Sequence, residues 1–263
     1  MSYSYPSGKT FYQLTGTGKQ TIVFIHPTGM GSAVFHYQRV LQKNFAVLTY
    51  DLRGNGRSGG LLPALSVREL ADDLYELLSL LSISKAIICG YSNGGCIAQE
   101  FALAYPDKTE GLLLIGGFPE VSTPLLTLEF KLGIALTGAG GMSCLSKAIA
   151  RAHAPDPCMK DILERYMMLS DPYGLYKQYQ MTFSYTATAR LHLLAMPVLL
   201  IYGSSDRYLK SYPAIYEQEI PHAKIVYISD AGHQIPTKFP NELNFILKHF
   251  IQNYIECSAH LHE

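Results

Sequence analysis

Residues 86–105 read Ala86-Ile-Ile-Cys-Gly-Tyr-Ser-Asn-Gly-Gly-Cys-Ile-Ala-Gln-Glu-Phe-Ala-Leu-Ala-Tyr105. The first four residues are apolar, which is typical of a buried strand. From Ile97 onward, apolar side chains recur at helical spacing, and Pro106 ends the pattern. The segment therefore predicts a buried strand that turns directly into a helix.

The turn between the two elements is Gly90-Tyr91-Ser92-Asn93-Gly94, a G-x-S-x-G motif. A chain that reverses within so few residues holds its central residue in a strained backbone conformation. Glycines two positions before and after remove the Cβ atoms that would clash. We therefore expect the Ser92 hydroxyl to project from the sheet edge, with the N–H of Asn93 pointing the same way. This geometry suits a nucleophile.

A second G-x-S-x-G, Gly56-Arg57-Ser58-Gly59-Gly60, shows how weak the motif is by itself. By composition alone, such a motif occurs in roughly one chain in ten of this length. Ser58 is followed by Pro63 rather than by a helix, so we expect a flexible loop in which its hydroxyl closes a turn. Residues 54–59 also fit G-x-G-x-x-G, but a dinucleotide site needs a helix that begins at the glycines. We therefore predict no cofactor.

The composition limits the class of protein. The 263 residues include 21 Lys plus Arg and 21 Asp plus Glu, and this balance predicts no basic surface for nucleic acid. Five cysteines without a C-x-x-C pair argue against a disulfide scaffold and a zinc site, so no metal is expected. We find no signal peptide and no apolar run of membrane-spanning length. These features favour a cytoplasmic protein whose partner is a small molecule, and they do not indicate an oligomeric state.

Predicted strands and helices alternate along most of the chain. This rhythm predicts an α/β fold with a mostly parallel, doubly wound sheet of about seven to eight strands and helices on both faces. Residues 10–14 and 21–25 are expected to form a hairpin, and residues 33–42 a helix. A capping box, Ser66-Val67-Arg68-Glu69, is expected to open another helix.

One segment interrupts the alternation, because no convincing strand occurs between residues 118 and 195. We expect three or four helices there, inserted over the carboxyl edge of the sheet, where ligands bind in open α/β folds. The predicted domains are a core of residues 1–118 and 195–263 and a helical cap of residues 119–194. Apolar cap side chains favour an uncharged substrate, although such residues at helical spacing also form cores; they include Met142, Met159, Met181 and Phe183.

A serine hydroxyl needs an imidazole to take its proton and a carboxylate to orient that imidazole. Among nine histidines, His233 is the candidate base, because it lies in a loop of small residues after the strand at 225–228. His26 ends a strand at the same edge, but its glycine-rich loop suits another role.

The candidate acid is Asp206, which lies just beyond the strand ending at Tyr202. Glu120, after the strand at 111–116, is a geometric alternative. Asp230 is only three residues from His233, and we expect it to point elsewhere.

Ser92, Asp206 and His233 occur in the order nucleophile, acid, histidine. Together with the G-x-S-x-G turn, this order resembles the α/β-hydrolase family over nearly the whole chain. The resemblance also includes Asp51-x-Arg53-Gly54-x-Gly56-x-Ser58 after the strand that precedes the capping box. The helical insertion is similar to the cap domain of that family.

The resemblance implies an oxyanion hole made by two backbone N–H groups, those of Asn93 and Thr28. In the family, the first long strand usually ends in His-Gly-x, where x is a donor; here it ends in His26-Pro27-Thr28. Proline fixes φ near about −65°, which tilts the following amide. A misaligned donor typically costs about 10²–10³-fold in turnover.

The predicted function is a serine hydrolase, a carboxylesterase acting on a small to medium apolar ester through an acyl-enzyme. The same triad in this family also cleaves C–C bonds beside a ketone or makes peracids, and some relatives are weakly catalytic ligand receptors in signalling. The sequence leaves these alternatives open, because one fold hosts many chemistries.

Overall fold

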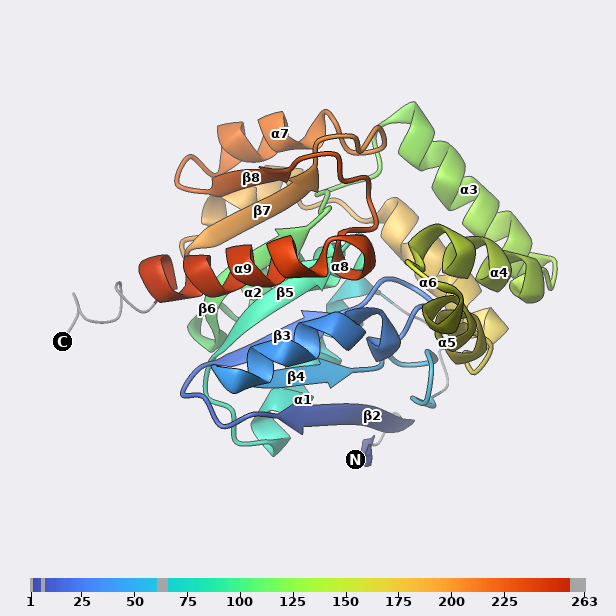
Figure 1. The fold of residues 1–263 in the computed structure, drawn as a ribbon, viewed down its shortest axis with the longest axis horizontal. Helices are drawn as coiled ribbons and strands as arrows, with labels where there is room; N and C mark the ends of the chain where they lie inside the picture. The colour runs from blue at the N-terminus through green and yellow to red at the C-terminus, as the bar shows by residue number, and fades with distance from the viewer. Residues whose placement is uncertain (1, 6–7, 61–65, 256–263) are drawn as a thin grey trace.

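The computed structural model describes residues 2–5, 8–60 and 66–255. Helices cover both faces of a central sheet (Figure 1). Its strand order is β1-β2-β4-β3-β5-β6-β7-β8; β1 and β2 are antiparallel to their neighbours, and the others run parallel. The predicted fold class is confirmed. The strands are β1 (Ser2–Tyr5), β2 (Gly8–Thr15), β3 (Thr21–Ile25), β4 (Ala46–Tyr50), β5 (Ala86–Tyr91), β6 (Thr109–Ile115), β7 (Val198–Gly203) and β8 (Lys224–Ile228).

The central strands are apolar on both faces, because each face is covered. In β3, Val23 and Ile25 enter one core, whereas Ile22 and Phe24 enter the other. The first core includes side chains of α1 (Val67–Leu80), α2 (Gly94–Ala104) and α7 (Tyr212–Glu219). The second includes side chains of the 3-10 helix η1 (Ser32–Lys43) and of α9 (Pro240–Phe250).

Local signals fixed some elements better than others. The Ser66 hydroxyl accepts the N–H of Glu69, and the Glu69 carboxylate accepts the N–H of Ser66, so the predicted capping box is confirmed. The helix expected at 33–42 is instead the 3-10 helix η1, kinked at Phe35. The predicted hairpin is wrong, since β4 lies between β2 and β3 and pairs with both. The buried β3 takes parallel neighbours on each side.

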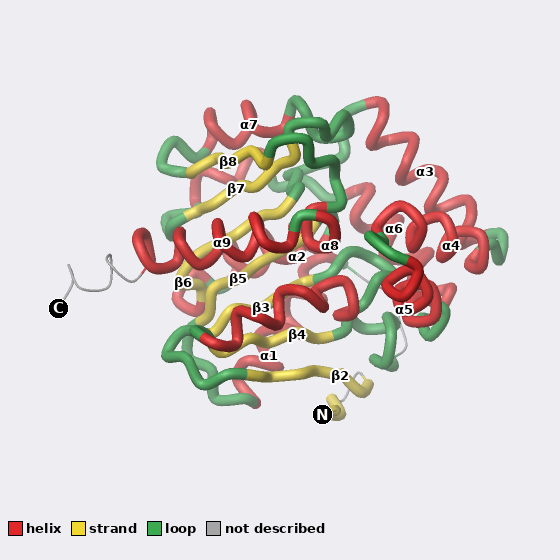
Figure 2. The backbone as a smooth tube through the Cα atoms, viewed as in Figure 1, coloured by secondary structure: helices red, strands yellow, loops and turns green. Residues whose placement is uncertain are grey.

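The insertion between β6 and β7 contains four α-helices, α3 (Pro124–Gly138), α4 (Met142–His153), α5 (Pro157–Met167) and α6 (Pro172–Ser184). Asp156 and Asp171 cap α5 and α6, and each is followed by a proline at the first helical position. The four helices gather beyond the carboxyl ends of the parallel strands, and the loops that follow those strands run toward them (Figure 2).

No helix in the described part of the chain has both the length and the apolar character required to cross a lipid bilayer.

Candidate active site

Ser92 lies at the turn from β5 to α2 in a left-handed backbone conformation, with φ of 53°. A Cβ atom at Gly90 would lie 2.6 Å from the Cα of Gly95, and one at Gly94 would lie 2.4 Å from the carbonyl oxygen of Ile25. Both contacts are too short for any side chain, so the two glycines are required by close packing. The strained turn expected from the sequence is present.

Ser92, His233 and Asp206 form a hydrogen-bonded chain. The Oγ of Ser92 lies 2.9 Å from Nε2 of His233, and Nδ1 of His233 lies 2.8 Å from Oδ2 of Asp206. A carboxylate only accepts, which assigns the imidazole proton to Nδ1 and leaves Nε2 to accept the serine hydroxyl. Asp206 itself is held by the N–H of Tyr208, which donates to Oδ1 over 2.9 Å.

Opposing effects act on the pKa of His233. Burial lowers it, but the hydrogen bond and charge of Asp206 raise it, with a further contribution from Glu129 of α3, and the net pKa lies above the ordinary 6.5. An imidazolium formed by transfer of the Ser92 proton to His233 would therefore be stabilised. This is the electrostatic requirement for a general base.

The imidazole of His233 fits against a residue with no side chain. Gly116 follows β6 with φ of 54°, and a Cβ there would lie 2.8 Å from Cε1 of His233. The ring of Tyr91 also packs against this imidazole, with ring centroids 5.4 Å apart. The Tyr91 hydroxyl lies 3.0 Å from the carbonyl oxygen of His233 and 3.0 Å from Nε2 of His153 in α4. Sequence reasoning missed this link between the histidine loop and the inserted helices, because no spacing pattern marks it.

The two residues that carry the predicted oxyanion donors are hydrogen-bonded to each other, and one of the two donor N–H groups is engaged in this contact. The N–H of Thr28 donates to Oδ1 of Asn93 over 3.0 Å, and Nδ2 of Asn93 donates to Oγ1 of Thr28 over 2.8 Å. The N–H of Asn93, at the start of α2, has no intrahelical acceptor. To bind an oxyanion, the N–H of Thr28 would have to give up its bond to Asn93.

The alternatives raised by the sequence have other partners. The Ser58 hydroxyl is buried, donates to the carbonyl of Asp51 and accepts the N–H of Phe11, so its loop is pinned rather than flexible. Glu120 accepts hydrogen bonds from the hydroxyls of Thr186 and Thr188.

Asp230 and His26 also lie outside the Ser92 chain. Asp230 is exposed, and its N–H donates to Ser204. His26 is fully buried between the Pro27 carbonyl and the Leu52 N–H, and burial lowers its pKa, so it is a neutral structural residue.

The apolar residues of the insertion that were singled out from the sequence pack into the protein interior. Met142, Met159 and Met181 are buried in the two cores, and Phe183 packs against one of them. They give no information about a substrate pocket.

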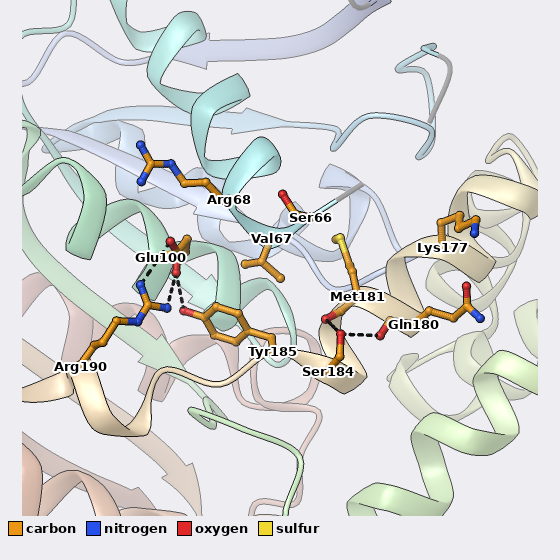
Figure 3. Close-up of a pocket in the computed structure, with 10 residues that line it drawn as sticks. All are labelled: Ser66, Val67, Arg68, Glu100, Lys177, Gln180, Met181, Ser184, Tyr185 and Arg190. Atoms are coloured by element: carbon orange, nitrogen blue, oxygen red, sulfur yellow. Dashed lines mark hydrogen bonds and ion pairs between the residues drawn. The ribbon is translucent and has the colours of Figure 1, made fainter. Parts of the chain in front are cut away.

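A buried carboxylate of the core holds the last part of the insertion, where Tyr185 and Arg190 lie. Glu100 of α2 is buried and accepts hydrogen bonds from Arg190 at 2.7 Å and from the hydroxyl of Tyr185 at 3.1 Å (Figure 3). A cavity of about 650 Å³ lies beside this cluster, between α1 and α6. Its described lining does not include Ser92, Asp206 or His233, and we assign it no part in a reaction.

Replacing Arg190 with alanine is expected to lower the free energy of unfolding by about 1–3 kcal/mol, because Glu100 would stay buried without its charged partner. Urea denaturation measures the change. Arg68→Ala is the matched control: its ion pair with Asp72 is exposed, and such pairs contribute about 0–1 kcal/mol. Equal losses in the two variants would contradict a structural role for the Glu100 cluster.

Among the residues described, no group of three or more His, Cys, Asp or Glu side chains is arranged to hold a metal ion. The buried cysteines at 89 and 96, which flank the turn, are core residues, and burial raises the pKa of both thiols.

Comparison with known proteins identifies the class. Residues 16–237 match the family described as serine aminopeptidase, S33. The chain belongs to this family and has the α/β-hydrolase fold.

Several named relatives are hydrolases. The sn-1-specific diacylglycerol lipase ABHD11 of Danio rerio is 28% identical over 270 residues, covering 94% of this chain and 82% of that protein. A structure from a study of carboxylesterases of Nitrososphaera gargenis is 25% identical with a TM-score of 0.83, covering 96% of this chain and 98% of the other. The enol-lactonase of Burkholderia xenovorans LB400 has a TM-score of 0.86 at 20% identity, covering 96% and 100%, and shows the shared fold.

Proposed function

We propose that this chain is a carboxylesterase that works through an acyl-enzyme on Ser92. The observation that carries the proposal is the continuous hydrogen-bonded chain from Ser92 through His233 to Asp206. The names of the lipase and carboxylesterase relatives support an ester as the substrate class.

In the first half of the reaction, Nε2 of His233 takes the proton of Ser92 while Oγ bonds to the ester carbonyl carbon. The carbonyl π pair moves onto its oxygen. The resulting oxyanion is stabilised by the N–H of Asn93 and by a hydrogen-bond donor of Thr28. When the carbonyl re-forms, the bond to the leaving alkoxide breaks, and His233 gives the alkoxide its proton. Water then repeats the sequence on the acyl-enzyme and releases the acid, which restores Ser92.

We also propose that residues 119–194 act as a cap over this site, with residues 1–118 and 195–263 forming the core. The carbonyl oxygen of Pro119 accepts the N–H of Ala187, so the entering and leaving segments of the insertion lie together. This supports an insertion whose two ends leave the sheet at neighbouring positions.

The acyl group we propose is small to medium and uncharged. Two buried apolar side chains of the cap, Met167 and Leu175, lie next to Gly29 in the loop that carries Thr28. Glu129 raises the pKa of His233 through its charge, and burial raises the pKa of Glu129 itself, so this carboxyl offers an anionic substrate no countercharge.

The test is hydrolysis of nitrophenyl butyrate before and after treatment with a fluorophosphonate. We expect turnover by the untreated protein, one phosphonate group per chain located on the peptide containing Ser92, and loss of turnover in proportion to labelling. Labelling without turnover would favour a ligand-binding relative, and turnover that survives complete labelling would contradict a serine nucleophile. Cleavage of a diketone in preference to the ester would favour a C–C hydrolase.

A further inference from the structure

Asn93 and Thr28 form a closed pair through two hydrogen bonds. Both residues are buried, with exposed fractions of 7% and 6%. The Thr28 N–H can only donate, so the carboxamide oxygen of Asn93 must face it, at 3.0 Å. Nδ2 of Asn93 therefore faces Oγ1 of Thr28, at 2.8 Å. The hydroxyl of Thr28 accepts this bond and keeps its own proton available for donation.

The two backbone N–H groups that follow Thr28 also have acceptors. The N–H of Gly29 donates to Oδ1 of Asn55 over 2.7 Å, and the N–H of Met30 donates to the carbonyl of Pro27 over 3.1 Å. In contrast, the hydroxyl proton of Thr28 has no acceptor within residues 8–60 and 66–255. Thr28 therefore has one donor left to offer an oxyanion beside the N–H of Asn93, and that donor is its side-chain hydroxyl.

We propose that the hydroxyl of Thr28, rather than its N–H, is the second oxyanion donor, and that Asn93 orients and polarises it. This proposal rests on the serine-hydrolase function proposed above. It assigns Asn93 two roles: its backbone N–H is one donor, and its carboxamide positions the other.

The energetic comparison favours the hydroxyl. Using the N–H of Thr28 would break its bond and leave Oδ1 of Asn93 buried without a partner, a cost of about 1–3 kcal/mol. Using the hydroxyl requires only rotation about the Cβ–Oγ1 bond, while the bond from Nδ2 is retained. A hydroxyl that accepts one hydrogen bond also becomes a stronger donor. No proton leaves Thr28 in this step, since it only donates a hydrogen bond to the oxygen that receives the carbonyl π pair.

Two substitutions of Thr28 test whether the hydroxyl or the N–H is the oxyanion donor. Thr28→Val keeps the shape and the N–H but removes the hydroxyl, and we expect kcat for nitrophenyl butyrate to fall by about 10²-fold with little change in KM. Thr28→Ser retains the hydroxyl and should recover most of kcat. Thr137→Val is the matched control, because its hydroxyl donates only to carbonyl oxygens of its own helix α3, those of Gly133 and Ile134.

Asn93→Ala gives an opposite prediction for the two donors. If the hydroxyl is the donor, losing its partner lowers kcat; if the N–H were the donor, removing Oδ1 would free it and raise kcat. A kcat for Thr28→Val within about threefold of wild type, or a rise in Asn93→Ala, would overturn the proposal. Binding of a trifluoromethyl ketone, which forms a tetrahedral oxyanion on the serine, should weaken in Thr28→Val by about the same factor as kcat.

A loss of stability in a variant would not be mistaken for a loss of kcat. Each kcat is calculated per site titrated to completion with a fluorophosphonate, so unfolded molecules are not counted. The initial rate of Ser92 phosphonylation is a second readout, since it also places an oxygen in the hole but needs no ester substrate. If wild-type protein is neither labelled nor active, the proposed function fails; if it is labelled and Thr28→Val is labelled equally fast, only the donor assignment fails.

Discussion

Ser92→Ala is expected to reduce kcat for nitrophenyl butyrate by at least about 10⁴-fold, the scale seen when a serine nucleophile is removed. Without Oγ there is no atom to attack the ester carbonyl, and His233 has no hydroxyl to deprotonate. The remaining turnover would come from water acting in a preorganised site. Steady-state kinetics with protein purified away from host esterases measures the loss.

Ser58→Ala is the control, because it changes the other G-x-S-x-G of the same chain. Its hydroxyl joins the N–H of Phe11 to the carbonyl of Asp51, so the substitution is expected to lower the free energy of unfolding by about 1–3 kcal/mol. It should leave kcat per folded molecule nearly unchanged. Equal activity in the Ser92→Ala and wild-type proteins, or a loss of activity only in Ser58→Ala, would refute the proposed nucleophile.

The sequence was sufficient to predict which loops converge. Ser92, Asp206 and His233 follow β5, β7 and β8, and the carboxyl ends of parallel strands meet at one edge of a sheet. Once the alternation of strands and helices was recognised, residues more than a hundred positions apart could therefore be placed at one site without any measured distance between them. The strained turn at Ser92 was equally predictable, because the motif itself includes the glycines at 90 and 94 that the close packing requires.

Side-chain pairing between distant elements could not be predicted. Asn93 and Thr28 are 65 residues apart, and Tyr91 and His153 are 62 apart, and neither pair has a spacing signal. Polar groups inside a protein must find partners, but the sequence does not say which of many acceptors is nearest. Whether the Thr28 N–H is free to bind an oxyanion depends on its pairing with Asn93, so it could be learned only from the three-dimensional structure.

The inserted helices show a second limit of prediction from sequence. Helical spacing predicts that Met142 of α4 and Met159 of α5 each lie on an apolar helix face, but it does not distinguish a face that meets a core from one that meets a cavity. Both residues are buried in the core. In contrast, the start of each helix α5 and α6 is a local matter of an aspartate cap followed by proline, and local signals of this kind can be read from sequence.

Asp206→Asn is expected to lower kcat by about 10⁴-fold through the tautomer of His233. Oδ1 of residue 206 accepts the N–H of Tyr208, so the oxygen of asparagine would stay there and its NH₂ would face Nδ1 of His233. Nδ1 would then have to accept, which places the ring proton on Nε2, facing Ser92. An imidazole in that state cannot take the serine proton.

The pH profile of the residual activity separates this mechanism from a loss of structure. In the wild-type protein, burial lowers the pKa of His233, but Asp206 raises it further, so the net pKa lies above 6.5. The base must be neutral, so kcat/KM should rise with pH through an inflection above 6.5. In Asp206→Asn the main raising effects are lost while burial remains, so the inflection should move to lower pH.

Asp230→Asn is the control for this pair of measurements, since Asp230 lies three residues from His233 but is exposed and contacts Ser204 instead. Its left-handed backbone, with φ of 59°, is one that asparagine also tolerates. Both kcat and the inflection should stay at wild-type values. An Asp206→Asn protein that keeps more than a tenth of wild-type kcat, or whose inflection does not move, would mean that this carboxylate does not orient His233.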